Sequence, residues 1–323
     1  LHINAAAVVP DCYAEWRPLI QDAIDLFLAR LSHSRTEAIT RHQAVLPPDT
    51  GEEERAVALM RDCPMLHKLG QVLARHQRLD AAFRARLQRL ENSAPSMRLD
   101  DVREHVLREL GDTVTRYRIE LSGEPIAEGS VAVVLPCTWA PPRAKRRRNG
   151  VLKVLKPGVS ELLAEDLAIL DEVTVLLDER KDRYKLPGLD YGDTLGSVRD
   201  LLTEEVKLDQ EQRHIREART VFDRIEGICV PKLLPFCTPR VTAMEAIAGV
   251  TMADYTERVG EAREQSKSYA TRIVESMLAH SVFSREALTF FHADPHAGNF
   301  MAMDDGQLAL LDWSLIGRLT KPE

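Results

Sequence analysis

The sequence lacks the features that would place it in a membrane or a secretory pathway. It contains no run of about 18 apolar residues, the minimum for a membrane-spanning helix. Its N-terminus has no basic start followed by a cleavable apolar core, so no signal peptide is predicted. Internal repeats and low-complexity blocks are also missing. These absences favour a cytoplasmic protein whose only membrane contact would be peripheral.

Cysteine is scarce and irregularly placed. The five cysteines are odd in number and show no close spacing of the kind that holds a metal ion. They are Cys12, Cys63, Cys137, Cys229 and Cys237. A reducing compartment fits this pattern best.

The chain also lacks an overall basic field, since its net charge is −7, and no nucleic-acid partner is predicted. The single basic run, residues 143–148, precedes Asn149 and Gly150 in an expected hairpin loop. A solvated loop is the favoured interpretation, and contact with anionic lipid or an acidic partner is the alternative.

The informative part of the chain is the stretch from Phe291 to Asn299, followed by an apolar strand that ends at Asp312. Asp294 and Asn299 stand five residues apart, and Asp312 follows Asp294 by eighteen. Kinases space a catalytic-loop Asp, a catalytic-loop Asn and a metal-binding Asp in this order. The alternative is a polar turn before an ordinary hairpin.

The residue types suit phosphoryl transfer. Mg²⁺ prefers carboxylate and amide oxygens, so Asn299 and Asp312 are predicted to hold it beside the phosphates of ATP. Asp294 can accept a proton from an attacking hydroxyl or orient a water molecule.

The amino-acid sequence of residues 291–299, together with Leu310 and Leu311 before Asp312, resembles that of the UbiB family of atypical kinase-like proteins. A second feature of that family, Lys-x-Gly-Gln on a helix before the kinase domain, is matched by Lys68, Gly70 and Gln71. The resemblance implies that Lys68 and Gln71 cover the pocket where a protein substrate would enter.

A nucleotide-binding lysine is expected on the strand that runs from Gly150 to Leu155. Because successive side chains of a strand point to opposite faces, Lys153 lies on one face with Val151, and Lys156 lies on the other face beside Pro157. Lys153 is therefore preferred, with Lys156 as the competing register.

The partner of Lys153 is expected from a carboxylate-rich helix spanning Leu201 to Arg219. With Glu211 as that partner, Glu205 becomes the first residue of the family's Glu-x-Asp motif, and Lys207 stands where the family has Asp. In the family this acidic pair holds the Lys-x-Gly-Gln helix, so an altered contact with Lys68 is an open alternative.

The family has an alanine-rich loop where ordinary kinases have glycines. Here Ala127 and Ser130 match, whereas Glu128 and Gly129 depart from the pattern. Gly129 can let the backbone approach a phosphate, but Glu128 would repel one unless it faces solvent or pairs with a lysine.

Residues 242–250 resemble the hinge between kinase lobes, and there Met244 and Glu245 are the expected adenine contacts. A buried strand ending in glycine is the alternative interpretation.

Together these motifs predict an α+β, protein-kinase-like two-lobed fold. A helical extension is expected over residues 1–110, an N-lobe with a five-stranded sheet over 111–245, and the start of a C-lobe over 246–323. A complete C-lobe needs further helices, so a truncated C-lobe is expected. The helical stripe from Trp16 to Leu28 is expected to pack on its neighbours, and a helical insertion over 159–200 is expected to contain a loop at Leu186 to Gly188.

The resemblance implies an ATPase that binds ATP and Mg²⁺ and supports quinone or isoprenoid lipid metabolism, with protein partners in a lipid-biosynthetic complex. A small-molecule or protein kinase is one alternative. A non-catalytic nucleotide-binding switch is the other.

Overall fold

The computed structural model describes residues 3–75, 80–88, 99–184, 190–258, 263–284 and 287–320. The chain divides into two compact units, and each is built from three separate stretches of sequence. Unit 1 comprises Leu1–Arg98, Glu128–Ala132 and Lys156–Val206. Unit 2 comprises Leu99–Ala127, Val133–Leu155 and Lys207–Glu323.

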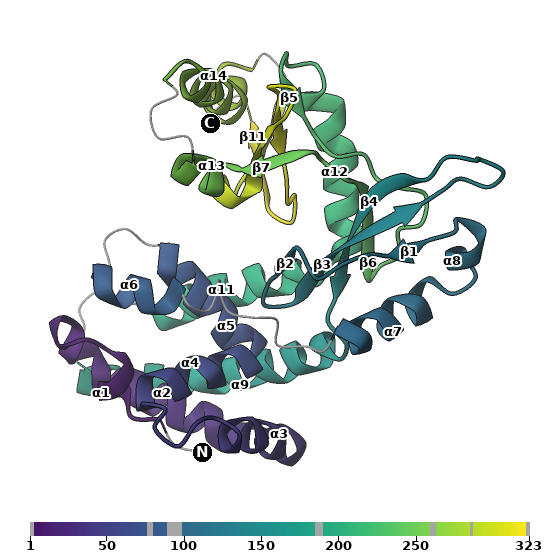
Figure 1. Cartoon of the computed structure of the whole chain (residues 1–323). Coiled ribbons are helices and arrows are strands. Elements are labelled where there is room, and N and C mark those ends of the chain that lie inside the picture. The colour runs from purple at the N-terminus through teal and green to yellow at the C-terminus, as the bar shows by residue number, and fades with distance from the viewer. Residues whose placement is uncertain are drawn as a thin grey trace. The chain divides into compact units, whose positions relative to one another are not determined.

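Unit 1 is helical (Figure 1). Its helices are α1 (Ala5–Val8), the 3₁₀ helix η1 (Asp11–Trp16), α2 (Arg17–Arg30), α3 (His33–Ala44), α4 (Glu52–Asp62), α5 (Pro64–Arg75), α6 (Ala81–Gln88), α9 (Val159–Glu179), α10 (Lys181–Tyr184) and α11 (Tyr191–Glu205). The predicted loop at Leu186 to Gly188 lies outside the described residues.

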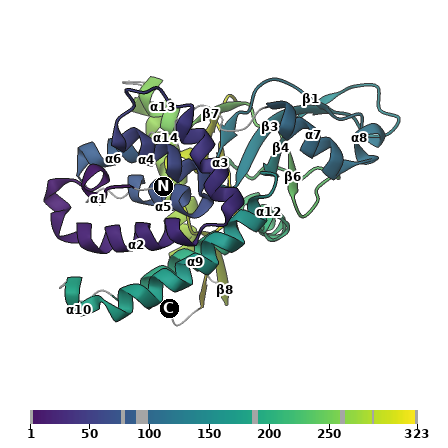
Figure 2. The same cartoon turned by 90° about the horizontal axis from the view of Figure 1, so that it is seen from below.

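The core of unit 1 joins the N-terminal helices to the insertion. Phe27 and Leu28 of α2 are buried in one cluster with Leu170 of α9 and Leu202 of α11. Both views show α2 running beside α9 (Figure 2). The apolar stripe of α2 therefore packs on neighbouring helices, as the sequence favoured.

One buried ion pair also ties this unit together. Asp166 of α9 is fully buried and accepts hydrogen bonds from Arg35 of α3 and from the backbone N–H of Met65 in α5. Three helices that are far apart in the sequence therefore meet at one carboxylate.

Unit 2 contains three sheets. The first has five strands in the order β1 (Glu120–Leu121), β3 (Ala132–Trp139), β4 (Arg148–Leu155) and β6 (Val241–Glu245), with β2 (Ala127–Glu128) also paired to β3. This confirms the expected five-stranded sheet. Residues Glu128–Ala132, which end β2, form the turn and begin β3, belong to unit 1.

The other two sheets follow the first along the chain. One has the order β5 (Ile228–Cys229), β10 (Leu308–Leu310), β9 (Phe300–Met303) and β7 (Gly249–Thr251), and the other pairs β8 (Leu288–His292) with β11 (Ile316–Thr320). The helices of unit 2 are α7 (Leu99–Leu110), α8 (Thr113–Arg116), α12 (Leu208–Phe222), α13 (Met252–Arg258), α14 (Arg263–Val274), the π-helix η2 (Glu275–Ala279), α15 (His280–Phe283) and the 3₁₀ helix η3 (Ala297–Asn299).

The prediction of one helix from Leu201 to Arg219 is wrong. Helix α11 ends at Glu205 and α12 begins at Leu208, because the backbone of Lys207 leaves the helical region at φ −94° and ψ 67°. The break lets Leu202 pack in the core of unit 1 while Ile215 packs in the core of unit 2. A single straight helix could not serve both cores.

None of the described helices is long and apolar enough to cross a membrane.

Candidate functional site

The predicted catalytic residues follow two strands of unit 2. Strand β8 ends at His292 and leads into the loop that carries Asp294, and the β9–β10 hairpin leads to Asp312. Trp313, which is fully buried, anchors this second loop by stacking on Phe290 at 5.5 Å between ring centroids. An apolar residue directly after Asp312 thus fixes the position of the carboxylate.

The two loops are held together by hydrogen bonds. Asn299 donates from Nδ2 to the carbonyl of Asp294 at 3.0 Å, and the N–H of Leu311 donates to the carbonyl of Asn299 at 2.8 Å. His292 lies between them, because its Nδ1 accepts from the N–H of Asp294 at 3.1 Å and its Nε2 donates to the carbonyl of Leu311 at 2.9 Å. This pattern requires the neutral tautomer with its proton on Nε2.

Sequence reasoning gave His292 no role, although it is buried and joins both catalytic loops. It also missed His214 of α12, whose Nδ1 lies 2.9 Å from the carbonyl of Trp313. His214 lies one helical turn after Glu211, and His292 lies two residues before Asp294. This proximity to predicted site residues is the only signal that the sequence offers for them.

Lys153, Glu211 and Asp312 converge. The Nζ atom of Lys153 lies 2.8 Å from Oε1 of Glu211 and 3.2 Å from Oδ1 of Asp312. Lys153 projects from β4 and Glu211 from the first turn of α12. The glutamate side chain is 3% exposed, so the ion pair is shielded from water on that side.

Asp312 has an unusual backbone conformation, with φ at +50°. A non-glycine residue held there stores about 1–3 kcal/mol of strain, and such residues cluster at functional sites. Its carboxylate also accepts from the N–H of Ser314 at 3.2 Å. The local turn therefore aims the carboxylate at Lys153.

The surroundings hold the pKa of Asp312 well below its usual value. Desolvation by the surrounding protein raises this pKa, but the Lys153 ammonium and the hydrogen bonds from Ser314 lower it by more. The side chain still keeps 40% of its surface exposed, so a ligand can reach a carboxylate that is charged at neutral pH.

The donor set fits a magnesium ion. Asp312 offers a carboxylate, and Asn299 offers its amide oxygen because Nδ2 is the atom engaged as a donor. Mg²⁺ is usually held by one or two protein oxygens together with substrate phosphates. Among the described residues no three His, Cys, Asp or Glu side chains gather as a metal site.

Lys156 has a different partner from Lys153. It pairs with Glu128 at 2.6 Å, and both side chains are nearly buried. The carboxylate that would repel a phosphate is thus neutralised by a lysine, one of the two conditions named from the sequence. Gly129 donates its N–H to the carbonyl of Ala132 at 2.8 Å, which closes the turn after the exposed Ala127.

The Lys-x-Gly-Gln helix is α5, and Lys68 is paired with Glu205 at the end of α11. Glu205 also accepts from Ser130 Oγ at 3.4 Å. Gln71 is buried, and its Nε2 lies 3.3 Å from Nε2 of His67. Glu205 therefore keeps a contact with Lys68 even though Lys207 replaces the acidic residue two positions later.

The expected hinge is the end of β6. Met244 pairs with Val151 across the sheet. Glu245 makes two hydrogen bonds with the backbone of Lys232: its N–H donates to the Lys232 carbonyl, and its side-chain Oε1 accepts from the Lys232 N–H, both at 2.9 Å. The backbone N–H of Glu245 is thus already used within the protein.

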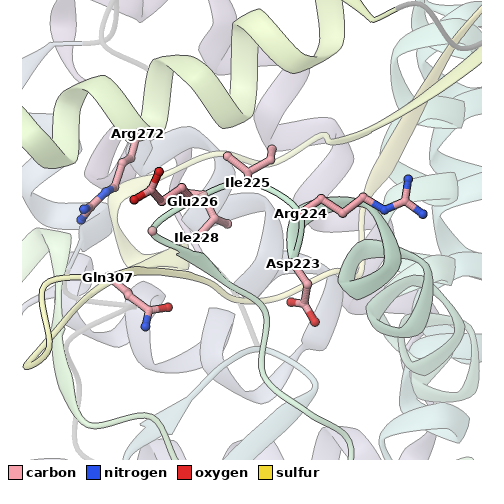
Figure 3. Close-up of a pocket in the computed structure, with 8 residues that line it drawn as sticks. Asp223, Arg224, Ile225, Glu226, Ile228, Arg272 and Gln307 are labelled. Atoms are coloured by element: carbon pink, nitrogen blue, oxygen red, sulfur yellow. The ribbon is translucent and has the colours of Figure 1, made fainter.

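A separate pocket of about 490 Å³ lies in unit 2 around the turn between α12 and β5 (Figure 3). It is lined by Asp223–Ile228 together with Arg272 and Gln307. None of the predicted site residues lines it.

The family model described as the ABC1 atypical kinase-like domain matches residues 89–323 of the chain. A protein of Haemophilus ducreyi described as a probable protein kinase UbiB is 27% identical over 271 residues, which cover 82% of this chain and 49% of that protein. A protein of Azotobacter vinelandii with the same description is 28% identical over 290 residues, covering 85% of this chain and 51% of that protein. The chain thus spans about half the length of the curated relatives it matches.

Among solved structures, a Mycobacterium tuberculosis protein in complex with erythromycin has a similar fold, with a TM-score of 0.56. The two chains are 22% identical, and the match covers 78% of this chain and 59% of the solved one. Its likeness concerns the fold, which is α+β and kinase-like.

Proposed function

The chain belongs to the family of ABC1 atypical kinase-like domains, and from that premise we propose that it binds ATP with Mg²⁺ and transfers or hydrolyses the terminal phosphoryl group. The observation that carries the proposal is the convergence of Lys153 on Glu211 and Asp312 at 2.8 and 3.2 Å. A lysine, a helix glutamate and a metal-binding aspartate in this arrangement recur in kinases.

Each residue has a proposed task. Lys153 contacts the phosphates of ATP while Glu211 keeps its ammonium in place. Asn299 and Asp312 hold the metal ion, which supplies neutralising charge to the phosphates. Asp294 is 36% exposed and orients the attacking hydroxyl or water, because it follows the rigid His292 link between the loops.

The loop between β2 and β3 is proposed to lie over the nucleotide through Ala127, Gly129 and Ser130. The adenine is proposed to bind near Met244 and Glu245. Both roles rest on the resemblance to UbiB proteins, as does the proposed support of quinone or isoprenoid lipid metabolism in a lipid-biosynthetic complex. A cytoplasmic location with peripheral membrane contact belongs to the same proposal.

The test is phosphate release from ATP, with and without Mg²⁺, by the wild type, by Asp312→Asn and by Asp305→Asn. The last is a control in the exposed turn of the β9–β10 hairpin. We expect Mg²⁺-dependent release by the wild type and the control, and a loss of at least about 100-fold in Asp312→Asn. Repeating the assay with vesicles containing anionic lipid tests the peripheral membrane contact.

The outcomes separate the three candidate functions. Phosphate release without an acceptor supports the ATPase, and transfer of labelled phosphate to an added small molecule or protein supports a kinase. If the wild type and Asp312→Asn both bind ATP and neither releases phosphate, only the nucleotide-binding switch remains.

A further inference from the structure

A pocket of about 270 Å³ lies within unit 1, lined by α3, by the adjoining ends of α4 and α5, and by the start of α9. Ser130 lies at its edge, but the other residues of the proposed nucleotide site are not part of it. The pocket thus calls for its own explanation.

Arg35 of α3 lines this pocket and carries one donor that the described protein does not use. Its side chain is 6% exposed, and Nη1 is bound to the buried carboxylate of Asp166. Over the part of the chain that the structure describes, its Nη2 atom is buried and has no hydrogen-bond partner. Because a buried donor without an acceptor is costly, a ligand oxygen at this position would be favourable.

Further positive charge surrounds the same space. Arg61 and Lys156 also line the pocket. Burial lowers the pKa of Lys156, the hydrogen bond and the negative charge of Glu128 raise it, and the positive charge of Arg61 lowers it by a smaller amount. Both cations border the space in which an anion would bind.

The start of α9 adds to this field. Its N-cap residue is Gly158, which has no side chain to cap the helix, and Pro157 and Val159 on either side line the pocket. The N-terminus of a 21-residue helix therefore lies beside the pocket without a side-chain cap, and the N–H of Val159 donates to the carbonyl of Lys156.

The acidic groups nearby limit the charge of a ligand. Asp62 lines the pocket and is hydrogen bonded to His42 at 2.9 Å, while Asp166 and Glu128 are paired with Arg35 and Lys156. A doubly charged phosphate would meet the repulsion of Asp62, whereas a single carboxylate would meet less of it. A carboxylate also matches the planar fork of a guanidinium.

The rest of the lining is apolar, including Ile39, Val159 and Leu162. A dry cavity of about 150 Å³ is enough to bind benzene, so this pocket has room for a compact apolar group beside the charged end. We propose that the pocket binds a small organic monocarboxylate, with its carboxylate on Arg35 and its apolar body against α3 and α9.

The proposal concerns a second site, and it does not depend on ATP binding. Lys156 links the two, because it pairs with Glu128 in the loop between β2 and β3. A carboxylate in the pocket would give Lys156 a second anionic partner and so loosen its hold on that loop.

The test is calorimetric titration of the whole chain with benzoate, its neutral isostere benzamide, and inorganic phosphate. We expect benzoate to bind one to one with a dissociation constant of about 1 mM or lower. Benzamide and phosphate should each bind at least about tenfold more weakly, since one lacks the charge and the other the apolar body.

Three variants locate the binding. Ala38→Phe fills the pocket and keeps every charge, so it should abolish benzoate binding. Arg35→Lys keeps a cation for Asp166 but removes Nη2, and it should weaken binding by about tenfold. Arg41→Lys, on the exposed side of the same helix, is the matched control and should bind as the wild type does.

Two results would overturn the proposal. One is no saturable heat with benzoate in a folded wild-type protein. The other is benzoate binding that Ala38→Phe leaves unchanged, because the ligand would then lie elsewhere on the surface.

Discussion

At the scale of single residues, two opposing effects determine the charge of the Asp312 carboxyl group: burial and pairing with a cation. Asp312 is desolvated, which raises its pKa, and it faces Lys153 and Ser314, which lower it by more. The same lysine is shared with Glu211. The Lys153 ammonium thus faces two carboxylates, an arrangement that suits a metal ion.

The pH behaviour of Asp312 follows from this pairing. Because its folded pKa is depressed, the stabilisation from the Lys153 contact is present above the ordinary aspartate value of about 3.9 and is lost only as pH falls through the lower folded value. We expect carbon-13 NMR of the side-chain carboxyl to titrate below the ordinary value in the wild type. In Lys153→Met the pKa should rise, since desolvation remains while the attraction is gone.

The control is Lys267→Met, which removes an exposed lysine of α14 and should leave the Asp312 titration unchanged. An unchanged Asp312 titration in Lys153→Met would show that the lysine does not set its charge.

A second residue-scale prediction concerns the buried pair in unit 1. Asp166→Asn removes the charge that balances Arg35, and both side chains are almost wholly inside the protein. Leaving a buried charge without its partner costs about 3–5 kcal/mol. We expect the urea midpoint of unfolding to fall accordingly.

Asp171→Asn on the same helix is the matched control. Its pair with Arg199 is about half exposed, and exposed pairs contribute only about 0–1 kcal/mol. Equal losses in the two variants would contradict the importance assigned to burial.

At the scale of elements, the hairpin that delivers Asp312 depends on a close approach between strands. Gly249 at the start of β7 lies against β9, and a Cβ atom there would sit 2.2 Å from the carbonyl oxygen of Ala302. No side chain fits that gap. The strand pairing that supports the catalytic loops therefore requires glycine at this position.

Gly249→Ala should destabilise the protein by about 2 kcal/mol or more, because backbone atoms rather than a flexible side chain must move. Gly196→Ala in α11 is the control, since a Cβ there meets nothing within 4 Å and alanine favours a helix. Thermal unfolding of the two variants checks the expectation. Equal melting temperatures would mean that β7 can shift away from β9 at little cost.

Much of the architecture could be predicted from local sequence patterns. The alternation in β4 selected Lys153 over Lys156, and the kinase-like spacing brought Asp294, Asn299 and Asp312 to neighbouring loops. These features depend on residues close in sequence or on a spacing that a hairpin preserves. The pairing of Lys153 with Glu211 was predicted from the kinase pattern of a strand lysine and a helix glutamate, since α9, α10 and α11 separate β4 from α12 in the sequence.

Other features could not be read from the chain because they depend on distant contacts. Arg35 and Asp166 are 131 residues apart, and each alone resembles a solvated helix residue. The break at Lys207 was missed since neither glycine nor proline marks it, and only the demands of two separate cores explain it. The roles of His292 and His214 likewise depend on backbone carbonyls that no sequence pattern indicates.

At the scale of the whole molecule, the boundaries suggested by motifs differ from those of packing. The expected division into residues 1–110, 111–245 and 246–323 follows the motifs. By packing, the insertion 156–206 belongs with the N-terminal helices, because Phe27 and Leu59 share a core with Leu163 and Leu202. The family match begins at residue 89 and so leaves out one side of this core.

A fragment of residues 89–323 should therefore be unstable in its helical part. Removing α1 to α6 exposes the apolar faces of α9 and α11, which are buried in the 323-residue chain. We expect such a fragment to aggregate or to bind a hydrophobic dye, as measured by light scattering and dye fluorescence. A monomeric fragment with the melting temperature of the full chain would show that the N-terminal helices are dispensable.

The interleaving of the two units has a consequence for synthesis on the ribosome. The helices α2 to α5 emerge well before α9 and α11, the segments that cover their apolar faces, and α11 ends only at residue 205. At about 5–20 residues per second the early helices wait on the order of ten seconds for their partners. During that interval Phe27, Leu59 and their neighbours are open to chaperones, so nascent-chain folding of this protein is expected to depend on them more than its modest size suggests.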